Sequence, residues 1–528
     1  MRWPERREIW IAAVTMAAIL VWTGRYFVNP DGVSYLDLSD DFATGRWSAA
    51  VNAHWSPGYP ALLALWLAPF RPGSEWETIA VHVLNGLLFL AALASFEVFL
   101  REVRRSSSTL VTPAVTFASY AVVLWSLLVL VTIKSVTPDM MLAAIGFAAA
   151  AMFTRIQTGR ASVSSHALFG FLLGAAALTK SFMFSVAVVM IIISFIAVRR
   201  TPGAIRRHAM SALVFGIIVG PQLVAVSMQA GRPAFSDSAR IVYALKVNRI
   251  AKFWIGPHVR VLSENPLALE YPIDKANRSY PLWDEPSFWY QGAAVHFDVA
   301  DQVRATTRNL RTDFGIALKI LVPLIVVILC RDRRSRMRNV HLAVLSLMVM
   351  GAYALLFSEA RLIGFWLALL VVSVLTGITL HTEESRGRTG RAFVHVISVI
   401  SVISFVTYIL DQSLDSRPDR GFGARHLQLD VASKLRELGI QPGSRVAVVG
   451  DESDIYWARL ARVQAGIQIP LPEAPKYWSM PESARGELNR RMALTGSRAI
   501  IASWTDPPAA DRSWIRVPGT RYSILPIR

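Results

Sequence analysis

The stretch ALFGFLLGAAALTKSFMFSVAVVMIIISFIAV, residues 167–198, decides how many times this chain crosses a membrane. It is apolar along its whole length apart from a few hydroxyl groups and one charge, Lys180. One crossing takes about 20 apolar residues, so the stretch is too long for a single ordinary span. Basic residues stand on both sides of it, Arg160 before and Arg199 after, and the positive-inside rule places both on the cytoplasmic face. The stretch therefore predicts two short membrane helices that turn back near Lys180.

Apolar stretches of similar length recur along the rest of the chain. Hydrophobic residues make up 53% of the 528 residues and charged residues 17%, and the mean hydropathy is +0.40, a composition typical of membrane proteins. The fold class that we expect is mainly α, a polytopic transmembrane bundle of about eleven spans. The expected spans are residues 9–28, 79–100, 110–133, 140–153, 167–179, 182–198, 209–228, 314–330, 342–357, 362–380 and 393–410.

Short basic connections between these spans account for much of the net charge of +18. They are residues 101–105, 155–160, 199–207, 331–338 and 386–391. Because they are dispersed between apolar segments, they indicate topology and not nucleic-acid binding. With all five on the cytoplasmic face, the amino terminus is cytoplasmic and the carboxyl terminus periplasmic or extracellular, as in a multi-pass protein of the cell inner (plasma) membrane. The single cysteine, Cys330, excludes an internal disulfide and any cysteine-based metal site.

The tail after the last span has a different pattern. Residues 411–528 predict a small extracytoplasmic α/β domain, with a helix at 431–438, a strand at 445–449, a helix at 455–462 and a strand at 466–469. Alternating helices and strands favour a partly parallel sheet. No glycine-rich phosphate loop follows the first strand, so nucleotide binding has no support. We therefore expect two domains, a transmembrane one at 1–410 with outer loops 29–78 and 230–313, and the tail.

The first outer loop carries the densest group of polar side chains. It contains NPDGVSYLDLSDD, residues 29–41, and HWSPGYP, residues 54–60. Four carboxylates thus follow the first span directly: Asp31, Asp37, Asp40 and Asp41. If Asp31 opens a helix along the membrane surface, Asp37 and Asp41 share one face of it, four residues apart.

This loop resembles that of the GT-C-type integral-membrane glycosyltransferases, which use polyprenyl-phosphate sugars as donors. In that group an Asp just after the first span, followed by a Tyr and then a Gly, is the catalytic carboxylate, and Asp31, Tyr35 and Gly45 match this pattern. Gly32 stands where the group often has a second acid. The motif at 55–60 looks like that of the bacterial family 39-like members.

Three further motifs on the same predicted face extend the resemblance. They are Thr137-Pro138-Asp139, Leu178-Thr179-Lys180 and Glu359-Ala360-Arg361. In related sequences the last of them often continues with Tyr, where this chain has Leu362. The resemblance implies an inverting transfer of a sugar from a polyprenyl-phosphate-linked donor to a glycan, lipid or protein acceptor on the outer face, without a cofactor.

The chemistry of such a transfer needs the same kinds of group. A carboxylate takes the proton of the acceptor hydroxyl, and fixed cations stabilise the charge that develops on the leaving phosphate. We assign Asp31 as the base, Asp37 and Asp139 as supporting acids, and Lys180 and Arg361 to the donor phosphate, with Lys134 predicted at the same level. The substrate loop that we expect comprises Tyr35, His54, Trp55, Tyr59 and Glu359, and we assign no metal ligand.

Each of these residues also has a structural interpretation. Asp31 and Asp139 can cap helices, Lys180 can extend its ammonium to the interface, and Glu359 can pair with Arg361. His54 can simply pack beside Trp55. Asp37, Asp40 and Asp41 can form a solvated face.

The second large outer loop, residues 230–313, is rich in cations and aromatic rings. These are Lys246, Arg249, Lys252, Trp254, His258, Arg260, Trp283, Trp289 and Tyr290. Such a loop can cover an active site or lie in the bilayer interface among membrane lipids. At the level of the whole protein, the rivals are a polytopic lipid or solute transporter and a non-catalytic scaffold.

Overall fold

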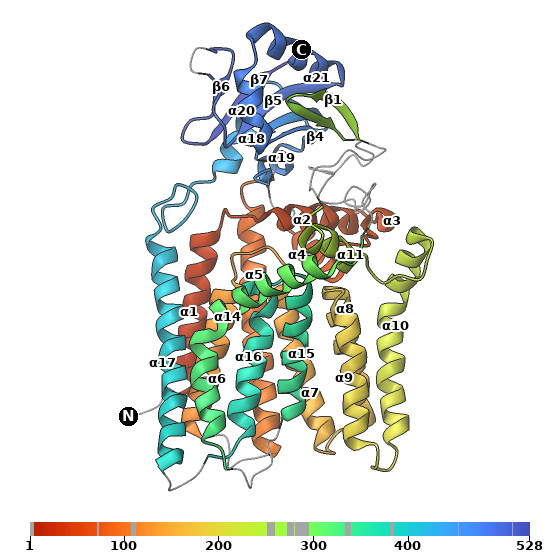
Figure 1. The fold of residues 1–528 in the computed structure, drawn as a ribbon, viewed down its shortest axis with the longest axis vertical. Coiled ribbons are helices and arrows are strands. Elements are labelled where there is room, and N and C mark those ends of the chain that lie inside the picture. The colour runs from red at the N-terminus through yellow and green to blue at the C-terminus, as the bar shows by residue number, and fades with distance from the viewer. Residues whose placement is uncertain are drawn as a thin grey trace.

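The computed structural model describes residues 5–70, 73–106, 112–250, 259–271, 279, 295–332, 339–380, 385–451, 453–508 and 511–527. A tall bundle of helices occupies one end of the molecule, and a twisted sheet with its covering helices occupies the other (Figure 1). Between them lies a layer of short helices that run across the end of the bundle (Figure 1). We call this end of the bundle the outer end, because the charge pattern of the sequence predicts that it faces away from the cytoplasm.

The bundle confirms the predicted fold class. Among the described residues, eight helices are long and apolar enough to cross a membrane. They are α1 (Arg6–Gly24), α5 (Glu77–Ser106), α6 (Pro113–Trp125) continued by the π-helical turn η1 (Ser126–Val131), α7 (Asp139–Gln157), α10 (Ala204–Ala230), α14 (Val299–Leu329), α16 (Ala360–Gly377) and α17 (Ser385–Leu414). Three shorter apolar helices match the remaining predicted spans: α8 (Val163–Thr179), α9 (Met183–Val198) and α15 (Val340–Leu356).

Local sequence explains two features of the bundle, the burial of α16 and the close packing of α8 against α10. Helix α16 is apolar on every face, and it is buried along most of its length at the centre. Helices α8 and α10 pack closely because Gly170 and Gly174 present no side chain there. A Cβ added at Gly170 would come within 2.2 Å of the Ser211 carbonyl oxygen, and one at Gly174 would meet Ile218 at 2.7 Å.

Four short elements form the layer at the outer end. They are α2 (Pro30–Ala43), α3 (Trp47–Ala50), α4 (Gly58–Leu67), and α11 (Ser238–Val242) continued by the π-helical turn η2 (Tyr243–Val247). Helix α2 begins at Pro30, whose fixed φ suits the first helical position and whose missing N–H is not needed there. The predicted surface helix after the first span is thus present.

In the described part of the chain, the sheet has seven strands in the order β1-β2-β4-β3-β5-β7-β6. Its central strand β3 (Arg445–Gly450) pairs in parallel with β4 (Gln464–Pro470) and β5 (Ser497–Ser503). The edges are antiparallel, formed by β1 (Arg260–Glu264) and β2 (Leu267–Glu270) on one side and by β7 (Tyr522–Pro526) and β6 (Ile515–Arg516) on the other. The helices of this part are α18 (Leu427–Glu437), α19 (Tyr456–Ala461), α20 (Ala474–Ser479), which follows the 3-10 turn η3 (Leu471–Glu473), and α21 (Glu482–Leu494).

The predicted helices and strands of the tail correspond to α18, β3, α19 and β4. Sequence analysis did not predict β1 and β2, which lie in the loop 230–313 and extend the sheet of the tail through β4. The sheet is therefore built from two distant segments. A second connection ties the tail to the first span, because Arg25 at the end of α1 donates hydrogen bonds to the carbonyl oxygens of Gly421, Phe422 and Ala424.

Candidate active site

A cavity of about 680 Å³ opens at the outer end of the bundle, beneath the layer of short helices. The polar and charged residues of its lining include Asp31, Tyr35, His54, Ser56, Lys180, Ser181, Lys246, Glu359 and Arg361. The apolar residues of its lining include Phe182, Phe184, Phe235, Ile241, Val242, Leu245, Ile250, Leu356, Phe357 and Leu362. The cavity can thus contact both the charged and the hydrocarbon groups of a bound molecule.

Arg361 is the centre of the charged residues of the lining. Its Nη2 donates to Asp31 Oδ2 at 2.8 Å, and its Nε donates to Glu359 Oε2 at 2.9 Å. Its Nη1 lies 3.6 Å from Asp139 Oδ2, and the other oxygen of Asp139 accepts from Lys180 Nζ at 2.5 Å. Asp139 is almost completely buried, whereas Asp31 and Arg361 each keep about a quarter of their side chain exposed to the cavity. Three carboxylates and two cations thus form one chain of ion pairs.

The ends of four helices bring these side chains together. Asp31 is in the first turn of α2, Asp139 is the first residue of α7, and Arg361 is in the first turn of α16. Lys180 follows the last residue of α8 in an extended conformation, at the turn that the sequence predicted. The ionised groups of the cluster therefore stand at the boundary of the bundle and not inside it.

Buried polar side chains of α5 fix the segments that carry Asp31 and Asp139. Asn85 Nδ2 donates to the carbonyl oxygens of Ile133 and Ser135, just before α7. His82 Nε2 lies 2.9 Å from the carbonyl oxygen of Phe27, just before α2. These bonds hold the segment before α2 and the segment before α7 against the same helix, α5.

A hydrogen bond also joins the segment before α2 directly to the segment before α7. Asn29, which precedes α2, accepts a hydrogen bond on Oδ1 from the backbone N–H of Val136 at 2.8 Å. Since Val136 lies in the segment that leads into α7, the first turns of α2 and α7 are held side by side. The positions of Asp31 and Asp139 relative to each other are therefore held by this hydrogen bond as well as by Arg361.

An aromatic group backs the cavity beside Asp31. The ring of Tyr35 packs edge-on against Trp55, with the ring centres 5.0 Å apart, and against Tyr59, with the ring centres 5.4 Å apart. The ring centres of His54 and Trp55 are 4.4 Å apart. Tyr35, His54 and Trp55 line the cavity, whereas Tyr59 is fully buried behind them and donates to Asn85. Burial lowers the pKa of His54 to about 4, so its imidazole is neutral at pH 7.

The structure brings together most of the residues that the sequence assigned. Asp31, Lys180, Arg361, Glu359, Tyr35, His54 and Trp55 line the cavity, and Asp139 supports two of them from behind. Tyr59 acts through packing, and Lys134 lies outside the cavity lining with its ammonium on Gln412. Asp37 is also absent from the lining and belongs to a separate network with Arg459.

One cation of the cavity was not singled out by sequence analysis. Lys246 lines it from η2, with Nζ 4.3 Å from the centre of the Phe357 ring. In the sequence it is one of several cations of the second large loop, and no motif distinguishes it from its neighbours. Six other residues that the sequence analysis named in this loop lie outside the described residues: Lys252, Trp254, His258, Trp283, Trp289 and Tyr290.

In the part of the chain that the structure describes, no group of three or more His, Cys, Asp or Glu side chains is arranged to hold a metal ion.

No family model matches the sequence, and no curated protein matches it. Solved structures do match it in fold. ArnT from Cupriavidus metallidurans in the apo state has a TM-score of 0.55 at 15% identity, over 98% of this chain and 97% of that chain. The chain has the GT-C fold.

The same GT-C enzyme bound to undecaprenyl phosphate also matches, with a TM-score of 0.55 at 14% identity over 98% of this chain and 97% of that one. The Archaeoglobus fulgidus oligosaccharyltransferase has a TM-score of 0.45 at 12% identity, over 94% of this chain and 68% of that chain. The predicted resemblance to the GT-C glycosyltransferases is thus confirmed for the fold.

Proposed function

We propose that this protein transfers a sugar from a polyprenyl-phosphate donor to an acceptor hydroxyl at the outer face of the membrane, with inversion at the anomeric carbon. The observation that carries the proposal is the position of Arg361, between Asp31 and Asp139 in a cavity that charged and apolar side chains line together. The likeness to ArnT, which has been solved with undecaprenyl phosphate bound, supports a lipid-phosphate ligand of the same kind.

In this proposal the donor phosphate lies against the cations of the cavity, and the lipid chain lies against its apolar side chains. Lys180, Arg361 and Lys246 are the cations of the lining, and they stabilise the negative charge that develops on the phosphate as it leaves. Asp139 positions two of them, since its two oxygens face Lys180 and Arg361.

Asp31 acts as the base. The acceptor oxygen attacks the anomeric carbon on the side opposite the phosphate, the bond from that carbon to the phosphate oxygen breaks, and Asp31 takes the hydroxyl proton. The lipid phosphate departs with the electron pair of the broken bond. A single displacement of this kind inverts the anomeric centre.

Donor binding and activation of the base are linked in this arrangement. Arg361 Nη2 donates a hydrogen bond to one oxygen of Asp31. A phosphate that binds Arg361 competes with this carboxylate for the guanidinium, and it therefore frees Asp31 to accept a proton when the donor is in place. The supporting-acid role predicted for Asp37 finds no support in its position outside the cavity lining.

The test is direct transfer by the purified protein. Undecaprenyl-phosphate sugars prepared with different sugars are supplied with a membrane-lipid extract as acceptor, and release of undecaprenyl phosphate is measured. We expect release to require the protein and one class of donor, and a deletion strain to accumulate that same donor lipid. Protein-dependent movement of the intact lipid across a vesicle membrane, with no release of sugar, would favour the transporter instead.

A further inference from the structure

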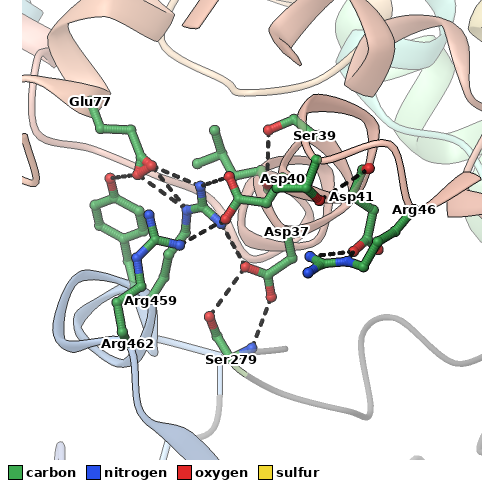
Figure 2. A network of polar contacts seen from close by, with 12 residues as sticks. Asp37, Ser39, Asp40, Asp41, Arg46, Glu77, Ser279, Arg459 and Arg462 are labelled. Atoms are coloured by element: carbon green, nitrogen blue, oxygen red, sulfur yellow. Dashed lines mark hydrogen bonds and ion pairs between the residues drawn. The ribbon is translucent and has the colours of Figure 1, made fainter. Parts of the chain in front are cut away.

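A buried arginine joins the sheet to the layer of helices that carries Asp31. Arg459 lies in α19, and only 2% of its side chain is exposed. Figure 2 shows its guanidinium enclosed by carboxylates from the first outer loop and from the start of α5. These carboxylates are Asp37 and Asp40 in α2, and Glu77 at the first position of α5.

Every nitrogen of the Arg459 guanidinium is used. Nε donates to both oxygens of Glu77 at 3.1 Å, and Nη2 donates to Glu77 Oε2 at 2.8 Å and to Asp40 Oδ1 at 3.1 Å. Nη1 donates to Asp37 Oδ1 at 2.8 Å and to Asp40 Oδ2 at 3.0 Å. Only the planar fork of an arginine can serve three carboxylates at once in this way, because the single ammonium of a lysine is a point charge.

Asp37 is also tied to the second outer loop. It accepts hydrogen bonds from the backbone N–H of Ser279 at 2.9 Å and from the Ser279 hydroxyl at 3.2 Å. The carbonyl oxygen of Ser279 accepts from the backbone N–H of Ala465 in β4. Three distant segments, the first loop, the second loop and the tail, therefore meet at one side chain of α2 (Figure 2).

Helix α2 lines the cavity with residues near its start and contacts the sheet domain with residues further along. Asp31 and Tyr35 line the cavity, while Asp37 and Asp40, less than three turns further along, are fixed to Arg459. The position of α2 along and about its axis thus depends on an anchor outside the bundle. Arg459 and the more exposed Arg462, which donates to Asp40 at 2.7 Å, offset the charge of the buried Asp37 and Glu77 and of the partly buried Asp40.

We infer that Arg459 is a positioning residue for the proposed transfer, through which the sheet sets the position of Asp31. This inference rests on the proposed function, because it assigns Arg459 an effect on the base and none on the donor. It predicts a defect in turnover with donor binding retained, since the cations that hold the phosphate stand on other helices.

The experiment compares Arg459→Lys and Arg459→Met in the full-length protein. A displacement of about 1 Å in a reacting group can reduce the rate about 10²-fold, so we expect kcat to fall by about that factor for Arg459→Met and by about 10-fold for Arg459→Lys. KM for the donor and binding of undecaprenyl phosphate should change less than about threefold. Arg462→Lys is the matched control, because it alters an exposed partner of the same Asp40 and should leave kcat within about twofold of the wild type.

The decisive measurement is a double-mutant cycle with Asp31→Asn. If Arg459 acts through Asp31, Arg459→Lys lowers kcat in the wild-type background and has no further effect in the Asp31→Asn background. Multiplicative effects of the two substitutions, or an Arg459→Lys protein with unchanged kcat, would overturn the inference.

Folding and the proposed function are tested separately from this inference. If Arg459→Met does not yield folded protein, the Arg459→Lys cycle still gives the answer, with the thermal midpoint of each variant as the check on folding. If Asp31→Asn itself leaves turnover intact, it is the proposed base that fails. The cycle then has no coupling to measure, and the inference about Arg459 falls with it.

Discussion

Arg361 Nη2 donates a 2.8 Å hydrogen bond to Asp31 Oδ2, and this bond joins two residues 330 positions apart in the chain. It connects the first turn of a surface helix to the first turn of the most deeply buried helix of the bundle. The same guanidinium reaches Asp139, so the cavity presents its proposed base and its proposed phosphate ligands as one interacting group. The first two predictions separate their roles.

Asp31→Asn should abolish most turnover while the protein still folds. Asn keeps the size and can begin a helix nearly as well as Asp, but it cannot accept the proton, so kcat should fall about 10²- to 10⁴-fold. Binding of undecaprenyl phosphate should persist, because Lys180 and Arg361 remain. A well-expressed Asp31→Asn protein that fully complements a deletion strain would remove Asp31 as the base.

Lys180→Met should affect both stability and donor binding, and a second substitution should separate the two. Removing one partner of a buried ion pair costs about 3–5 kcal/mol, and the partial exposure of Lys180 makes about 3 kcal/mol the upper end here. Adding Asp139→Asn removes the buried carboxylate that has lost Lys180, so the thermal midpoint should recover while binding of undecaprenyl phosphate does not. Recovery of binding together with stability would show that Lys180 is only a structural partner of Asp139.

His426→Phe should make the protein more resistant to mild acid. His426 is stacked on Tyr26 with the ring centres 4.6 Å apart, and among the described residues neither of its ring nitrogens has a hydrogen-bond partner. Burial lowers the pKa of His426 to about 4, so between pH 6.5 and pH 4 the unfolded chain binds a proton that the folded one does not. Stability is therefore lost as the pH falls through this window, by about 2 kcal/mol at pH 5.

Phe keeps the stacking at position 426 and does not titrate. The unfolding midpoint of His426→Phe should match the wild type at pH 7.5 and exceed it at pH 5, as measured in detergent. His395→Phe, at an unrelated position in α17, is the control. Equal pH dependence in the wild type and His426→Phe would contradict the assignment.

Removal of residues 428–528 should leave an inserted bundle without turnover. The deletion takes away β4, which pairs with β2, and Arg459, which compensates Asp37, Asp40 and Glu77. The bundle has its own large apolar core, so the truncated chain should still reach the membrane fraction. Turnover above about a tenth of the full-length rate would show that α2 is positioned without the sheet.

Topology reporters should place the two ends of the bundle on opposite faces. Fusions after Arg105, Arg207 and Arg391 should report the cytoplasm, and one at Gly443 the outside, because the basic connections stay on the cytoplasmic face. A cytoplasmic signal at Gly443 would put the cavity on the inner face and would contradict the proposed outer-face transfer.

The helices of the bundle and the members of the charged cluster could be predicted from local sequence. A run of apolar residues of the right length predicts a span wherever it occurs, and the turn at Lys180 followed from length and flanking charge alone. Once the spans alternate, Asp31, Asp139, Lys180 and Arg361 must stand at one end of the bundle. The structure adds which of these residues contact one another: Arg361 bridges Asp31 and Asp139.

The partner of Asp37 could not be predicted in this way. Its spacing from Asp41 indicates a shared helix face but not what that face meets, and its guanidinium partner is 422 positions away in the tail. Likewise β2 joins the sheet along the edge that β4 offers, with β1 paired to its other side, and Lys246 is distinguished from other cations by the cavity it lines. Hydrophobic length and flanking charge act locally, so the sequence by itself determined the bundle and the end at which the charged residues gather. The choice of an ion-pair partner or a strand neighbour depends on which distant segments fold together, and only the tertiary structure decided that.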